Sequence, residues 1–204
     1  MSVPRRVVLD VSQLPAHVFG RRDMMWWGTL GFMIIEGFTL VLCAAAHVYL
    51  RKNFSAWPPE GTPLPSLVVP TIQVGFMLVS LFASARLAKA AQRFDLAKTR
   101  AWLTVDGTFG AIFVGLRVWE LTRSLNVRWD ANAYGSAQWL VVGAHGTLVA
   151  IAFAETVGMA LIFWSGPIEK KHFSDASDIA FYGWFIVLSW LPLYVLCFLL
   201  PYWI

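Results

Sequence analysis

The sequence predicts an all-α, polytopic membrane protein whose fold is a bundle of five transmembrane helices. The first observation is composition: 58% of the 204 residues are hydrophobic and only 14% are charged. Soluble domains contain about 45–50% apolar and about 25% charged residues. The second is a mean hydropathy of +0.61. The third is a pattern of five apolar runs, each long enough for the roughly 20 residues that a helix needs to cross a bilayer.

Short polar connections separate these runs. The segment before the first run is polar and contains four arginines, so residues 1–24 are predicted to form an N-terminal tail and residues 25–204 one transmembrane domain. The first run is longer than the apolar part of a signal peptide, and we expect it to be a retained span. The predicted spans are residues 25–50, 67–92, 101–122, 136–165 and 178–203.

The connections set the predicted boundaries. The first, "RKNFSAWPPEGTPLPSL", is rich in Pro and Gly and predicts an irregular loop. The second, "RLAKAAQRFDLAKTR", is strongly basic. Eleven of the sixteen Lys and Arg residues lie in the tail, the second connection and the fourth connection. By the positive-inside rule we expect a cytoplasmic N-terminus and a periplasmic C-terminus.

The basic residues follow this topology and are not gathered into a stripe with interleaved aromatics, so no nucleic-acid partner is expected. Cys43 and Cys197 lie inside apolar runs without a CxxC or Cys/His spacing, which predicts small buried residues. No GxSxG, HExxH or phosphate-loop motif occurs in the sequence. We expect no catalytic residue and no metal site in this chain.

Ionisable residues inside the spans are the main candidates for a functional site, because a charged side chain is costly in a bilayer. Glu36, Asp106 and Glu155 are each predicted to lie roughly 9–17 Å from the cytoplasmic end of their span. Two readings stay open for them. They form a ligand or pathway site, or they pair with one another and hold the bundle together.

A second group of ionisable residues is predicted nearer the outer face. Arg117 and Glu120 are spaced i,i+3 on one helix and can neutralise each other. His47 and His145 lie on different helices at this level, which permits a b-type haem with two axial histidines as an alternative. A transporter is not favoured, because the sequence contains no repeat pair with broken helices.

Five stretches in order resemble subunit III of the haem-copper oxidases. "LPAHVFGRRDMMWWGTLGFMIIEGF" is similar to the start of the short bacterial subunit, and "WPPEGTPLPSLVVPTIQV", with Trp57 and Pro58, to the family's Trp-Pro-Pro loop. "RVWE", "AYGSAQWLVVGAHGTLVAI" and "HFSDASDIAFYGWFIVLSWLPLYV" resemble the later helices. The likeness covers the chain from about Leu14 to Trp203. The seven-helix members have two further N-terminal helices, so the chain resembles the five-helix form.

The resemblance implies an accessory subunit without a redox centre of its own. Such a subunit packs beside catalytic subunit I, with subunit II in the same complex, in the bacterial inner membrane. Haem and copper belong to the partner subunits, and this chain is expected to hold phospholipid in a cleft while supporting proton uptake and oxygen access. It also implies that Glu36 lies near bound lipid and that Glu120 meets His145 between two helices.

Some positions depart from the family pattern. Its histidine and aspartate on the last helix correspond to Trp184 and Val187, and a second histidine after "GAHG" corresponds to Leu148. We hypothesise that Glu155 replaces the missing aspartate as a polar partner inside the bundle. The departures leave two alternatives: a subunit associated with a nitric oxide reductase or an atypical oxidase, and a lipid-binding or assembly protein without a stable oxidase partner.

Overall fold

The computed structural model describes residues 18–203, so residues 1–17 of the predicted tail lie outside the described residues. All regular structure in the described part is helical, and five helices are long and apolar enough to cross a membrane. This confirms the predicted fold class. The five helices are α1 (Met24–Lys52), α2 (Val68–Gln92), α3 (Leu96–Trp119), α4 (Ala133–Ser165) and α5 (Lys170–Tyr194).

Short elements extend this set. A single turn, η1 (Gly20–Arg22), precedes α1. The widened π-helical turn η2 (Glu120–Ser124) continues α3, and η3 (Val195–Leu199) with α6 (Leu200–Trp203) continues α5. Widened turns of this kind are rare and frequently lie at functional positions. The η2 turn begins at one of the predicted intramembrane acids.

Side-chain caps explain why two helices begin earlier than predicted. Glu169 and His172 form a capping box ahead of α5, so the polar residues 170–177 form its first two turns instead of a connection. Asp95 caps α3 by accepting a hydrogen bond from the Lys98 backbone N–H at 3.0 Å. The predicted starts at residues 178 and 101 were based on hydrophobicity alone. Hydrophobicity indicates the apolar part of a helix but not the residue at which the helix begins.

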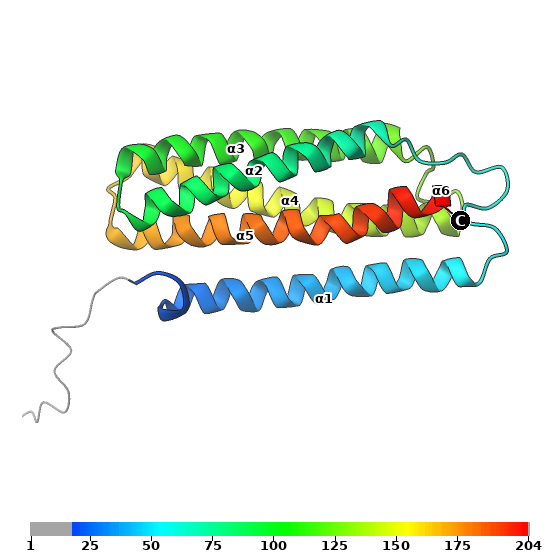
Figure 1. The fold of residues 1–204 in the computed structure, drawn as a ribbon, viewed down its shortest axis with the longest axis horizontal. Coiled ribbons are helices and arrows are strands. Elements are labelled where there is room, and N and C mark those ends of the chain that lie inside the picture. Colours follow the sequence, from blue (N-terminus) through cyan, green and yellow to red (C-terminus); the bar gives the residue numbers. More distant parts are fainter. Residues whose placement is uncertain (1–17, 204) are drawn as a thin grey trace, which may run out of the picture.

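The helices run alternately up and down. Figure 1 shows the start of α1, the α2–α3 connection and the α4–α5 connection at one end of the molecule, with the C-terminus at the other. The helices α2 to α5 pack around a shared apolar core, and α1 lies along one side of them against α4 and α5. The two described chain ends therefore lie at opposite ends of the bundle, as an odd number of crossings requires.

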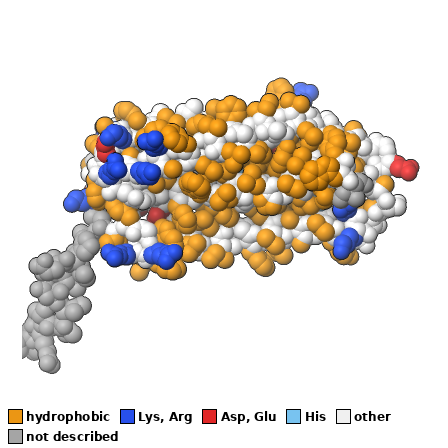
Figure 2. All heavy atoms as spheres, in the orientation of Figure 1, with side chains coloured by type: hydrophobic (Ala, Val, Ile, Leu, Met, Phe, Trp, Pro, Cys, Tyr) orange, Lys and Arg blue, Asp and Glu red, His pale blue; other side chains and the backbone are white. Residues whose placement is uncertain are grey.

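Large apolar side chains cover the outside of the bundle. On α1 alone, Ile34, Ile35, Phe38 and Val41 are each more than 60% exposed. Figure 2 shows Lys and Arg side chains at the end where α1 begins, with apolar side chains over the middle of that face. Soluble monomers rarely expose contiguous apolar patches of this size. The surface is that of a multi-pass membrane protein.

Candidate functional site

Each of the three acids predicted at similar depth shares a hydrogen bond, a cavity or a groove with Tyr182 on α5. The Tyr182 hydroxyl donates a hydrogen bond to Glu36 Oε2 at 2.8 Å. Tyr182 also lines a small cavity together with Asp106 and an open groove together with Glu155. The three acids thus lie on three different helices and in three different surroundings: a buried hydrogen bond for Glu36, a small cavity for Asp106 and an open groove for Glu155.

Glu36 is buried, with 6% of its surface exposed, and faces α5. Its Oε2 accepts the tyrosine hydrogen bond, while its Oε1 has no hydrogen-bond partner among the described residues. The ion pairs of the described part do not include Glu36. The carboxyl group is thus held by one neutral hydrogen bond and not by a cation.

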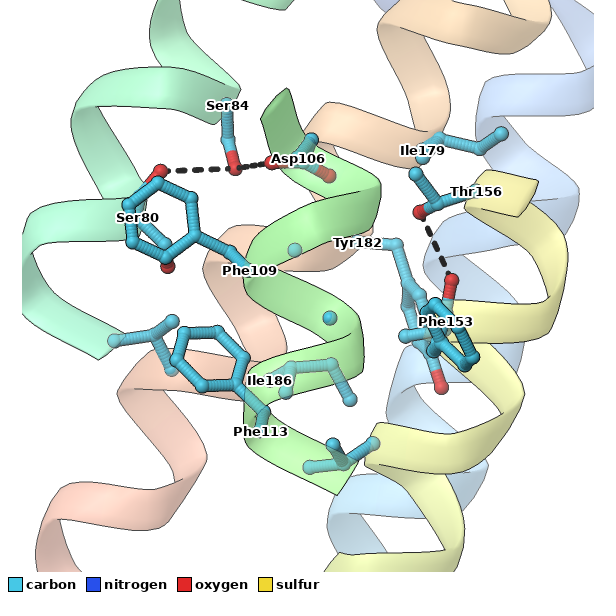
Figure 3. A pocket seen from close by; sticks show the side chains of 15 residues that line it. Ser80, Ser84, Asp106, Phe109, Phe113, Phe153, Thr156, Ile179, Tyr182 and Ile186 are labelled. Carbon is cyan, nitrogen blue, oxygen red and sulfur yellow. Dashed lines mark hydrogen bonds between the residues drawn. The ribbon is translucent and has the colours of Figure 1, made fainter. Parts of the chain in front are cut away.

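Asp106 lies at a small cavity between α2, α3, α4 and α5 (Figure 3). Its Oδ1 accepts a hydrogen bond from the Ser84 hydroxyl at 2.9 Å, as the dashed line in Figure 3 marks. The cavity measures about 50 Å³ and also borders Ser80 and Thr156. A space of this volume with several polar groups can hold one or two water molecules, since each takes about 30 Å³.

Glu155 lies on the outside of α4, where its side chain is exposed. It lines a groove of about 390 Å³ between α1, α4 and α5, with Asp178 and Tyr182 on the α5 side. Glu155 thus lies beside α5, but in an open groove and not among the buried residues of the bundle. The expectation that Glu155 replaces the missing helix-5 aspartate inside the bundle is therefore wrong, because its side chain is exposed and not enclosed by the helices.

A second polar centre joins α3, α4 and α5 deep in the bundle. Arg117 and Glu120 form an ion pair, with 3% and 0% of their side chains exposed. Arg117 Nη2 lies 3.2 Å from His145 Nδ1, and His145 Nε2 lies 2.9 Å from the Ile186 carbonyl oxygen. A guanidinium can only donate, so Nδ1 accepts and the imidazole proton is on Nε2, donating to Ile186.

Trp190 of α5 completes this centre. The Arg117 guanidinium lies 3.8 Å from the centroid of the Trp190 ring, and the His145 ring centroid lies 4.7 Å from it. Gly146 makes room for the arginine, because a Cβ atom there would lie 2.8 Å from Arg117 Cγ. A cation over an indole ring in a desolvated site is attracted by about 2 kcal/mol or more.

The expected meeting of Glu120 with His145 is corrected by this geometry. Arg117 contacts both residues, and the described hydrogen bonds of His145 go to Arg117 and to Ile186. The i,i+3 spacing predicted the Arg117–Glu120 pair correctly, but a sequence does not give the rotation of α3 against α4. The long Arg117 side chain makes the contact with His145 that was expected of the shorter Glu120.

The same contacts bear on the b-type haem alternative. An axial ligand needs a free ring nitrogen, and both ring nitrogens of His145 are hydrogen-bonded. His47 is fully buried, and neither of its ring nitrogens has a partner within residues 18–203. Its ring packs edge-on against Trp57 at 5.5 Å. The two histidines are therefore held differently, and His145 is engaged in packing helices together.

The Trp57–Pro58 pair lies in the connection between α1 and α2, and its peptide bond is cis. The Trp57 ring also packs edge-on against Tyr134 near the start of α4, with centroids 5.1 Å apart. This loop thus covers the end of the bundle and contacts both α1, through His47, and α4.

Two residues that sequence reasoning missed are Tyr182 and Asp178. Asp175, Asp178 and Tyr182 are spaced i, i+3 and i+7, which places them on one face of a helix. The predicted start of this helix at residue 178 hid the pattern, because Asp175 was placed in a connection. The cap that starts the helix earlier is formed by Glu169 and His172, which do not match the usual Ser/Thr-x-x-Glu/Gln signature, so the sequence contained no clear sign of it.

Comparison with known proteins places these features in context. No protein-family model matches the chain. A protein named cytochrome c oxidase subunit 3 from Thermostichus vulcanus is 28% identical over 189 residues, which are 90% of this chain and 91% of that protein. The protein of the same name from Synechocystis is 26% identical over 89% of this chain and 78% of its own length.

A third protein of this name, from Bacillus subtilis, is 29% identical over 59% of this chain and 61% of its own length. The described part of the chain has five helices that are long and apolar enough to cross a membrane. These comparisons confirm the resemblance: over most of its length, the chain is similar to proteins named cytochrome c oxidase subunit 3.

Proposed function

We propose that the chain is a non-catalytic accessory subunit of a respiratory haem-copper oxidase in a bacterial inner membrane. The observation that carries the proposal is similarity to proteins named cytochrome c oxidase subunit 3 over 90% of the chain. The N-terminus faces the cytoplasm, as the distribution of Lys and Arg indicates. The subunit packs beside catalytic subunit I, with subunit II in the same complex, and haem and copper reside in those partners.

Its contribution is to hold phospholipid and to support proton uptake and oxygen access by the catalytic subunit. Two grooves beside α1 support this part of the proposal. One lies between α1, α4 and α5, and a second, of about 440 Å³, is lined by residues of η1, α1, α2 and α5. Both have apolar walls and a few polar groups, which suits an amphiphile.

The test is activity during prolonged turnover. Complexes that contain Glu36→Ala are expected to retain less phospholipid and to lose oxygen-consuming activity faster, because Glu36 and Tyr182 lie beside the first groove. The initial rate and the haem spectrum should stay unchanged. The matched control is Glu60→Ala, an exposed acid in the α1–α2 connection. Wild-type lipid content and wild-type decay in Glu36→Ala would refute a lipid-holding role for this site.

A further inference from the structure

The cavity beside Asp106 lies within the membrane-spanning part of the bundle. Asp106 lies ten residues after Leu96, the first residue of α3, and thus roughly 15 Å along the helix axis. Residues of α2, α4 and α5 close the cavity around it (Figure 3). An ionised carboxyl group at this depth is costly unless a cation pairs with it.

The surroundings of Asp106 supply no such cation within the described part of the chain. The ion pairs between described residues do not include Asp106. The described residues that line the cavity, from α2, α3, α4 and α5, include no Lys, Arg or His and no second Asp or Glu. Tyr182 is the other titratable residue of this lining, and its hydroxyl donates to Glu36 at 2.8 Å. An ionised Asp106 would therefore have no counter-charge here.

The hydroxyl groups at the cavity have already committed their protons. Ser80 and Thr156 each donate to a backbone carbonyl oxygen of their own helix, at 2.7 and 2.9 Å. Ser84 has one hydrogen and two candidate acceptors, of which Asp106 Oδ1 at 2.9 Å is closer than the Ser80 carbonyl oxygen at 3.3 Å. A hydroxyl that donates its proton still has lone pairs to accept with. The polar side chains of the lining thus present acceptors to the cavity, and none of them offers a donor to Asp106 Oδ2.

We propose that Asp106 binds a proton at neutral pH and, as a neutral carboxylic acid, donates a hydrogen bond into this cavity. A protonated carboxyl group has one donor and further acceptor capacity. Its Oδ1 accepts from Ser84, and the proton on Oδ2 matches the acceptors of the lining. The cavity, of about 50 Å³, has room for a water molecule that accepts this proton and donates to the Ser80 or Thr156 hydroxyl. Proton binding at Asp106 is independent of the accessory-subunit function proposed above.

A metal ion is a poorer partner for Asp106 than a proton. Hard cations such as Ca²⁺ and Mg²⁺ take about six or more oxygen ligands. The side chains of this cavity supply one carboxyl group and a few hydroxyls, and most of the remaining wall is aromatic or aliphatic, as at Phe109, Phe113 and Phe153. A proton needs no such ligand set, and it removes the charge that makes the buried carboxyl group costly.

Infrared difference spectroscopy of the purified complex at neutral pH tests this directly, because a carboxylic acid has a C=O stretching band that a carboxylate lacks. The wild-type spectrum minus that of Asp106→Asn should contain one carboxylic-acid band. The asparagine amide keeps one acceptor and a donor in the same shape, so the variant is expected to assemble. The matched control is Asp130→Asn in the α3–α4 connection. Hydrogen bonds from Arg128 hold the pKa of Asp130 below its usual value, so its difference spectrum should contain carboxylate bands instead.

Ser84→Ala is a second variant that leaves the carboxyl group in place. Loss of the Ser84 hydrogen bond to Oδ1 should shift the carboxylic-acid band to higher frequency without removing it. Carboxylate bands and no acid band in the Asp106→Asn difference spectrum would overturn proton binding and point to a cation from a partner chain. An acid band that Ser84→Ala leaves unmoved would overturn the assignment to Asp106. Should Asp106→Asn fail to assemble, the Ser84→Ala shift alone decides, because an ionised Asp106 has no acid band to move.

Discussion

Tyr182 donates a hydrogen bond to Glu36 at 2.8 Å, and this contact joins α5 to α1 beside the groove that Tyr182 lines. The remaining helices form a closed set, whereas α1 lies along their side with most of its large apolar residues facing outward. The hydrogen bond between this carboxyl group and this phenol is therefore a buried polar contact that joins the outlying helix to the bundle.

Tyr182→Phe should loosen this contact. The phenylalanine keeps the ring packing but leaves Glu36 without a hydrogen-bond partner among the described residues, at an expected cost of about 1–3 kcal/mol. Thermal unfolding of the purified complex measures the effect. The control is Tyr49→Phe, because Tyr49 is 69% exposed on α1. Equal melting temperatures for the two variants would show that the Glu36 contact contributes little.

His145→Leu should destabilise the helix interface through Arg117 and not through Glu120. The substitution removes the acceptor of the Arg117 hydrogen bond and the donor to the Ile186 carbonyl, which should cost about 1–3 kcal/mol. Thr147→Leu, an exposed position on the same helix, is the matched control. An unchanged melting temperature of the His145→Leu complex would contradict the described network.

Gly146→Ala should also destabilise the protein, although alanine favours a helix. Its Cβ would lie 2.8 Å from Arg117 Cγ, and overpacking of this kind costs about 1–3 kcal/mol. Gly143→Ala, one turn earlier on α4, has no atom within 4 Å of the added Cβ. That variant should be neutral or stabilising by up to about 1 kcal/mol. A stabilising effect of Gly146→Ala would mean that Arg117 is not packed against this glycine.

The fold was largely predictable, because length and hydropathy alone determine which segments can cross a bilayer. The predicted helix boundaries were wrong where polar caps, such as Glu169 with His172, determine the residue at which a helix begins. Hydrophobicity does not indicate those residues. Within the site, the i,i+3 pair of Arg117 and Glu120 was predictable from spacing on one helix.

Contacts between helices were not predictable in the same way. Whether His145 contacts Arg117 or Glu120 depends on the rotation of α3 and α4 about their axes. That rotation cannot be read from the spacing of residues along either helix. The hydrogen bond between Glu36 and Tyr182, and the separate hollows that hold Asp106 and Glu155, depend likewise on the packing of α1, α3 and α4 against α5. Similar depth suggested a shared polar layer, whereas the three acids lie in different surroundings, and Tyr182, which binds Glu36, has no charge to mark it in the sequence.

Purification of this chain through an affinity tag, from the membranes of its own host, is the decisive test of the proposed function. We expect it to copurify with a larger haem-containing subunit, and the complex to consume oxygen with the Soret band carried by that partner. A partner that reduces nitric oxide would place the chain in the alternative complex. Recovery of the chain alone, or a Soret band that stays with this polypeptide after the subunits are separated, would contradict the proposal of an accessory oxidase subunit.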